Sequence, residues 1–371
     1  GFRVELTATG SYTESISQYY IINPQSSYNS FSSEMFSGSY DMTILSIGTA
    51  FESLNDDNTS PVYDRFINEL APQISRKLAS EHANFADDNY QMQTDTTNIF
   101  YDGYGLISQN VLVPAFLAAY TGMDVDEVSL DPVPSSLTDS YKMIRPNWRI
   151  TYDGLTNIKF IKRYLKNFSI NHSYISTYTI SNFLSDPDYL DMNNDGFSDD
   201  RGINHNFRSL YEISSISLNE KFSPLIGFDM TWVNSLLTRL EYKKARTINL
   251  TLTNNQITET VGNEFVIGGG YRFDDVRVNV GDNNYVSDLN LRLDFSIRHD
   301  ITMIRRILEQ YDEITAGSKN TKIRTTADYM LNERFNLQFF YERIQNIPET
   351  SGAFANSNSR FGFSLTFTLI P

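Results

Sequence analysis

Side chains that alternate between large apolar residues and small or hydroxylated residues recur along much of this chain. In residues 361–369 every odd position is large and apolar, and every even position is small or hydroxylated. A β-strand turns successive side chains to opposite faces, so this segment has one apolar face and one polar face. Such a strand is typical of a membrane β-barrel, in which one face meets lipid and the other meets water.

The same alternation recurs in roughly ten to fourteen segments with turn signals between them. Residues 289–298 keep one register over the ~9–11 positions that a tilted strand needs to cross a bilayer, whereas soluble strands average ~5–6 residues. Arg292, Asp294 and Arg298 fall on the polar phase of this segment, where water or other charges can meet them. Length and charge placement therefore favour a membrane barrel over a soluble sandwich. Further alternating segments lie at 1–9, 37–51, 147–153, 166–181, 206–219, 225–233, 247–253, 265–273, 323–330 and 335–342.

The composition fits spanning strands and gives no sign of spanning helices. The mean hydropathy is −0.36, and no run of ~18 apolar residues occurs. Aromatic residues make up 13% of the chain, a share that aromatic girdles at two membrane–water interfaces would explain. The net charge of −15 argues against a nucleic-acid partner. The absence of cysteine excludes disulfides and Cys-ligated zinc.

Residues 52–146 break the alternation and are expected to be partly helical. Ser60 followed by Pro61 predicts a helix start, with an N-cap and a proline at the first helical position. Apolar residues at helical spacing continue to position 78, and Pro72 is expected to kink the helix. A second apolar run at 111–120 is too short to span a membrane as a helix.

The expected organisation is strands at 1–51, an insertion at 52–146, and strands again at 147–371. The insertion is either a plug-like loop domain between barrel strands or a small packed cap without a transport role. Residues 301–318 suit a helix and an extended strand equally well. The chain opens in strand alternation without a starting Met, so we interpret it as a processed or C-terminal portion of a longer protein.

One acidic segment resembles the start of a calcium-binding loop. Asp191, Asn193, Asp195 and Asp199 have the spacing of the ligands in a D-x-N-x-D-G loop, which would bring several oxygens together around Ca²⁺. The twelfth position is Gly202 instead of the bidentate Glu that completes an EF-hand. The alternative is a solvated acidic loop, because Asn, Asp and Gly dominate loops in general.

No other motif indicates catalysis or a cofactor. The four histidines, at positions 82, 172, 205 and 299, have no metal-site spacing, and no nucleophile elbow is present. Glycines 268–270 have strand patterns on both sides, so they more plausibly admit neighbouring groups than bind a dinucleotide. Lys243, Lys244 and Arg246 fit either anionic lipid head groups or a solvated strand end. We therefore expect no enzymatic activity.

Long ordered blocks lie at 113–122, 146–154, 176–179, 222–232, 239–246, 254–259, 263–273, 288–298 and 315–317. These blocks resemble the SprA (Sov) family of gliding-motility proteins, the giant outer-membrane translocons of type IX secretion in Bacteroidota. The resemblance covers residues 105–371 well and residues 1–104 loosely. The chain departs from outer-membrane strands in its final residues, Leu-Ile-Pro, which lack a terminal aromatic.

The resemblance implies a single-chain antiparallel transmembrane β-barrel of about 36 strands, of which this chain would be the C-terminal portion. It implies protein secretion across the outer membrane, with folded cargo proteins that carry C-terminal secretion signals. The expected partners are the remaining strands of the same barrel, a PorV-like outer-membrane shuttle protein, a periplasmic plug protein and outer-membrane lipid. The alternative function is a self-contained porin or solute transporter; an outer-membrane enzyme or a surface adhesin is a further rival.

Overall fold

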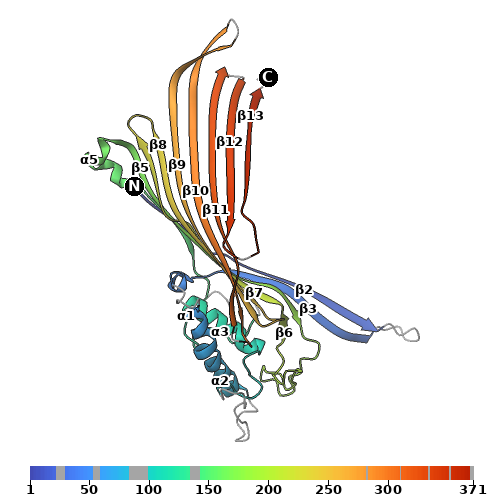
Figure 1. The fold of residues 1–371 in the computed structure, drawn as a ribbon. Coiled ribbons are helices and arrows are strands. Elements are labelled where there is room, and N and C mark those ends of the chain that lie inside the picture. Colours follow the sequence, from blue (N-terminus) through green and yellow to red (C-terminus); the bar gives the residue numbers. More distant parts are fainter. Residues whose placement is uncertain are drawn as a thin grey trace.

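The computed structural model describes residues 1–21, 30–52, 59–82, 99–133, 143–280, 283–309, 311–332, 335–350 and 352–367, and most of these lie in one antiparallel sheet (Figure 1). The predicted antiparallel all-β class is confirmed. None of the described helices is long and apolar enough to cross a bilayer. The thirteen strands are β1 (Phe2–Thr7), β2 (Gly10–Ile21), β3 (Ser30–Thr43), β4 (Asn147–Tyr152), β5 (Leu165–Ser185), β6 (Tyr211–Ile213), β7 (Ser215–Trp232), β8 (Leu237–Thr251), β9 (Gln256–Val280), β10 (Asn283–Arg306), β11 (Tyr311–Asn332), β12 (Phe335–Pro348) and β13 (Asn356–Phe367).

The thirteen strands form ten rows, because three pairs of strands each share a row. β3 and β4 both pair with the same side of β5, at Thr43↔Thr177 and Trp148↔Tyr174. Arg145 N, just before β4, donates to the carbonyl oxygen of Thr43, the last residue of β3, at 3.0 Å. The chain therefore leaves this row after β3 and returns to the same place to begin β4. β1 and β2 likewise share the row beside β3 and β4, and β6 and β7 share the next row after β5. The sheet is thus a meander in which each row pairs with the next.

The helices between β3 and β4 begin at Pro61, where the sequence predicts a helix start. They are α1 (Pro61–Arg65), a π-helical turn (Phe66–Leu70), α2 (Ala71–Glu81) and α3 (Gln109–Thr121). Ser60 caps α1, since its hydroxyl accepts a hydrogen bond from Tyr63 N at 3.3 Å. Pro72 has no N–H to donate to the carbonyl four residues earlier, and the turn before it is π-helical instead of α-helical.

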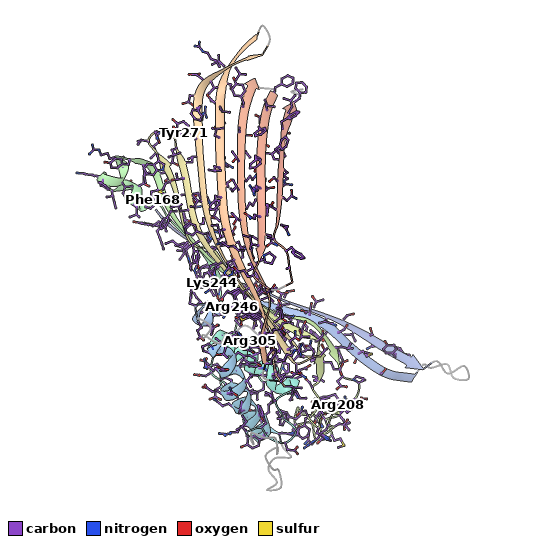
Figure 2. The ribbon with its side chains drawn as sticks, viewed as in Figure 1. Phe168, Arg208, Lys244, Arg246, Tyr271 and Arg305 are labelled. Atoms are coloured by element: carbon purple, nitrogen blue, oxygen red, sulfur yellow. The ribbon has the colours of Figure 1, made fainter. Side chains whose placement is uncertain are left out.

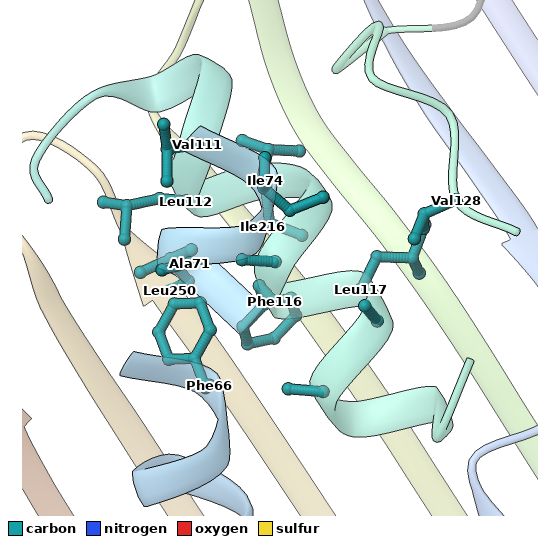
Figure 3. Packing of buried hydrophobic residues seen from close by; sticks show 14 of the residues in the cluster. Phe66, Ala71, Ile74, Val111, Leu112, Phe116, Leu117, Val128, Ile216 and Leu250 are labelled. Atoms are coloured by element: carbon teal, nitrogen blue, oxygen red, sulfur yellow. The ribbon is translucent and has the colours of Figure 1, made fainter. Parts of the chain in front are cut away.

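These helices share one hydrophobic core with the lower ends of the strands (Figure 3). The rings of Phe66 and Phe116 meet edge to face, with centroids 6.2 Å apart. Ile216 of β7 and Leu250 of β8 are fully buried beneath them. Every residue from 111 to 120 in α3 is buried. Burial of this helix against the sheet therefore accounts for the apolar run.

Three strand predictions are refined by the structure. Residues 301–306 continue β10 and 311–318 begin β11, so the extended alternative is correct. Ile307, just after β10, is buried in the core that the strands share with the helices. The predicted strand at 37–51 ends at Thr43, and residues Ile47–Thr49 form a 3₁₀ turn. β13 ends at Phe367, and positions 368–371, including the last two of the alternating segment, lie outside the described residues.

Candidate functional site

A band of partly or fully exposed apolar side chains crosses the upper part of the sheet on one face, and we call it the apolar belt. Cross-strand pairs such as Phe295↔Ile267 and Phe339↔Phe363 keep the belt in register from strand to strand. The side chain of Leu293, at its centre, is 49% exposed. The belt consists of Phe2, Val4, Leu6, Ile150, Tyr152, Phe168, Ile170, Ile226, Phe228, Met230, Leu240, Tyr242, Phe265, Ile267, Tyr271, Phe273, Leu289, Leu291, Leu293, Phe295, Ile297, Ile323, Ala327, Leu337, Phe339, Tyr341, Phe361, Phe363 and Leu365.

Aromatic residues lie at both ends of the belt on β4, β5 and β7. At the end next to the helices, Trp148 stacks on Tyr174 with ring centroids 4.4 Å apart, and Tyr174 lies 5.0 Å from Phe222. At the far end, Trp232 donates from its indole nitrogen to Thr238 Oγ1 at 2.9 Å. Rings with one apolar and one polar side are typical of both membrane–water interfaces.

The opposite face of the same strands is polar along its length and carries many ion pairs. Lys322 Nζ of β11 lies 2.8 Å from Glu342 Oε1 of the neighbouring strand β12. Lys243 Nζ lies 3.2 Å from Glu241 Oε2 and 3.7 Å from Glu264 Oε2. The charges on this face therefore largely compensate one another, and the face presents a hydrated surface.

Of the glycines at 268–270, which were predicted to admit neighbouring groups, Gly268 makes room for charged side chains of the polar face. A Cβ on Gly268 would lie 3.0 Å from Asp294 Oδ1 and 3.3 Å from Arg239 Cβ, because both side chains lean over the strand from either side. Gly269 points to the belt face, and a Cβ there would meet nothing within 4 Å. Only the polar face is crowded at this point.

The helices pack on the face that carries the belt. β9 and β10 pair without a shift from Phe273↔Leu289 to Gln256↔Arg306, so odd positions of β10 stay on one face over this length. Leu293 therefore shares its face with Met303 and Arg305, which are 1% and 0% exposed beneath the helices. Figure 2 shows Tyr271 in the tall part of the sheet and Arg305 where the helices begin.

Two buried ion pairs join the helical segment to the sheet. Arg246 Nη2 lies 3.0 Å from Glu220 Oε2, and Arg246 also donates to the carbonyl and hydroxyl of Thr49 at 2.8 and 2.9 Å. Ser46 Oγ donates to Glu220 Oε1 at 2.7 Å. Both charged side chains are nearly inaccessible, at 5% for Arg246 and 3% for Glu220.

The second pair lies on the neighbouring strands. Arg305 contacts Glu259 at 3.5 Å and Asp312, and its guanidinium lies over the ring of Tyr63 at 5.4 Å. None of these residues was among the predicted site residues. The sequence does contain a signal for Glu259 and Arg305. Both are charged residues at odd positions of their strands, and the other odd positions carry the apolar side chains of the belt.

The basic residues Lys243, Lys244 and Arg246 do not form one group. Lys243 lies on the polar face, Lys244 Nζ lies over the ring of Phe51 at 4.8 Å on the belt face, and Arg246 is buried. The lipid-binding alternative for these three residues as one cluster therefore has no support in the geometry.

The four residues of the predicted calcium loop lie together between β5 and β6, where they accept backbone hydrogen bonds. Asp191 accepts from the amides of Asp195 and Gly196 at 3.2 and 3.0 Å, and Asp199 accepts from the amide of Met192 at 2.8 Å. In the described part of the chain, no group of three or more His, Asp or Glu side chains converges as a metal site. Calcium at Asp191, Asn193, Asp195 and Asp199 stays a prediction.

His82 joins this loop to the helices. Its ring stacks on Phe197 at 5.2 Å and meets Phe207 edge-on at 4.5 Å, and its Nδ1 lies 3.1 Å from Tyr104 Oη. Its Nε2 lies 4.0 Å from Asp195 Oδ2. Burial lowers the pKa of His82, while Asp195, Asp199 and Asp191 oppose this shift and Arg201 adds to it. The geometry gives this histidine a packing role.

Comparison with known proteins finds no matching family model and no matching curated protein.

Proposed function

We propose that this chain forms part of the wall of an outer-membrane β-barrel that conducts folded proteins, as its resemblance to the SprA family implies. The observation that carries the proposal is the apolar belt, which stays in register across all ten rows of the sheet. On β10 it runs from Leu289 to Ile297, which is close to the ~9–11 residues that a tilted strand needs to cross a bilayer.

Lipid explains both faces of the sheet better than water does. Soluble monomers rarely expose apolar patches beyond a few hundred Å², whereas the side chains of Phe361 and Phe363 alone are 77% and 76% exposed at one edge of this belt. Arg and Lys on a lipid face would cost about 2–4 kcal/mol each at the midplane. Within the height of the belt on β9 and β10, the basic residues Arg272 and Arg292 point to the other face, and Arg343 of β12 is on the belt face only at its end near the helices, opposite Ile323.

The wall would work without making or breaking a bond. Its backbone hydrogen bonds are satisfied between strands, its belt faces lipid, and its polar face lines the lumen. Ion pairs such as Lys322–Glu342 limit the net field that cargo would meet. Since the helices pack on the belt face, they would lie outside the lumen, beyond the edge of the membrane.

The lengths of the connections suggest an orientation. Most connections at the far ends of the strands are short turns, such as residues 233–236 between β7 and β8, and the longer one there, residues 153–164 between β4 and β5, is still shorter than the helical segment. The other ends carry the helical segment and the connection from Ser185 to Tyr211. Barrels of this kind have short periplasmic turns and longer extracellular loops, so we assign the helices to the extracellular side.

A gene deletion tests the function. Removing the parent coding region and comparing culture supernatants by proteomics should show the loss of many secreted proteins at once. Loss of uptake of a single nutrient, with the secreted proteins unchanged, would instead identify a solute transporter. Stable small channels formed in planar bilayers by these residues alone would also favour the transporter.

A further inference from the structure

The connection between β4 and β5 gathers positive charge in an otherwise acidic chain. Residues 154–166 hold Lys159, Lys162, Arg163 and Lys166 and no acidic residue, whereas the whole chain has a net charge of −15. The connection contains a 3₁₀ turn (Gly154–Asn157) and the short helix α5 (Lys159–Lys162). We call residues 158–166 the basic hairpin.

The charges of the basic hairpin are exposed and free of acidic neighbours. Among the described residues, no carboxylate lies within ion-pair distance of any of the four. Lys166 Nζ lies 3.5 Å from Ser235 Oγ, and the guanidinium of Arg163 lies over the ring of Tyr164 at 5.7 Å. These four cations can therefore bind an external anion without first breaking an ion pair.

Apolar side chains of the basic hairpin are exposed beside the cations. Phe160 is 73% exposed, Ile158 48% and Tyr164 45%. The rings of Phe160 and Tyr164 meet edge to face at 5.6 Å. Basic residues interleaved with exposed aromatic and aliphatic ones are typical of segments that lie in a membrane interface.

The basic hairpin lies at the far end of the apolar belt. Val233 N donates to Tyr164 O at 3.0 Å, and Leu165 pairs with Trp232. A few residues further along β5 and β7, the rings of Phe168 and Phe228 stack within the belt, with centroids 6.0 Å apart. Figure 1 shows α5 at the end of β5 away from helices α1–α3, and Figure 2 labels Phe168 below it.

We propose that the basic hairpin binds the phosphate head groups of anionic lipids in the leaflet at its end of the belt. The inference rests on the proposed membrane wall, which sets the depth of the hairpin. A Lys or Arg near an anionic membrane surface strengthens binding to that surface by about fivefold. The exposed aromatic rings fix the hairpin at head-group depth, so its cations meet phosphates and its rings meet the upper acyl chains.

Tryptophan fluorescence can test this, because the chain has only two tryptophans. Trp148→Phe leaves Trp232, beside the basic hairpin, as the single reporter. The protein is folded into phosphatidylcholine vesicles that contain a minor fraction of phosphatidylglycerol, with bromine quenchers on the chains of one lipid or the other. Brominated phosphatidylglycerol should quench Trp232 several times more than its mole fraction predicts.

Neutralising the hairpin should remove this enrichment. In the variant Lys159→Gln, Lys162→Gln, Arg163→Gln and Lys166→Gln, quenching should fall to the mole-fraction value. The matched control loses four charges on the polar face, which no ion pair among the described residues engages: Arg3→Gln, Lys221→Gln, Arg292→Gln and Arg324→Gln. The control should keep the enrichment. If the fourfold hairpin variant does not fold, Lys159→Gln with Lys162→Gln replaces it.

The outcomes separate the two proposals. Equal quenching by both brominated lipids, unchanged in the hairpin variant, overturns lipid binding and leaves the membrane wall intact. Absence of quenching by either lipid overturns the wall itself. Equal loss of enrichment in the hairpin variant and the control shows that net charge acts alone, and it also overturns the specific role of the hairpin.

Discussion

An arginine placed on each face of β10 distinguishes a lipid-facing wall from a soluble sheet. Leu293 lies at the middle of the belt, opposite Gly269 on one side and Thr325 on the other. Its side chain is 49% exposed, so no tight packing inside the protein opposes Leu293→Arg. In water such a surface change alters stability by about 0.5 kcal/mol or less.

In a bilayer the same change carries a desolvation cost. Arg near the midplane of the lipid face lowers the stability of a barrel by about 2–4 kcal/mol, which is roughly a 30- to 1,000-fold change in the folding equilibrium. Ser296→Arg is the matched control, because position 296 points to the polar face of the same strand. There a new arginine meets water, with Lys322 opposite it on β11, and should cost about 1 kcal/mol or less.

Reversible denaturant unfolding from phosphatidylcholine vesicles measures both variants. We expect the midpoint of Leu293→Arg to fall well below that of the unsubstituted protein, and the midpoint of Ser296→Arg to stay close to it. Equal midpoints for the two variants would mean that the belt does not face lipid. The proposal of a membrane wall would then be untenable, whatever the resemblance of the sequence.

Three further predictions concern packing and protonation. Arg246→Met leaves Glu220 buried without its partner and should cost about 3–5 kcal/mol in chemical unfolding, and adding Glu220→Gln should recover much of this loss. Gly268→Val crowds the polar face and should cost about 1–3 kcal/mol, whereas Gly269→Val on the open belt face should cost much less in the same assay. Burial favours the neutral form of His82 in the folded state. The stabilisation by neutral His82 is therefore full above about pH 6.5 and is lost as the pH falls through the lowered pKa. Amide exchange in the helical segment should accelerate over that pH range, and His82→Gln should make the exchange rate less dependent on pH.

Alternation alone predicted which side chains share a face, because the strand period is fixed by covalent geometry. Leu289, Leu291 and Leu293 lie on one face as expected, and Arg292 and Asp294 lie on the other. The capped helix start at Ser60 was predictable for a similar reason: hydroxyl capping depends on adjacent residues only. Such features need no knowledge of the rest of the chain.

The buried charges could not be assigned from local pattern. Glu259 and Arg305 interrupt the apolar phase of β9 and β10, so residues 256–264 were not recognised as the start of a strand that runs to Val280. The structure explains them through contacts of high sequence separation, since helices from another part of the chain cover this area and Tyr63 meets Arg305 there. Arg246 is a similar case, because its partners Thr49 and Glu220 come from distant segments.

The two outer rows of the sheet support the view that other strands complete the wall. In the strand order of the described residues, β13 pairs only with β12, and β1 pairs only with β4. The exposed apolar side chains of the belt continue to both edges of the sheet. Phe361 and Phe363 at one edge and Phe2 and Leu6 at the other are all more than half exposed. In lipid, each unpaired backbone group along such an edge costs several kcal/mol. An edge strand that is apolar at membrane depth and open in its hydrogen bonding is therefore suited to a neighbouring strand, and a large barrel can supply one at each side.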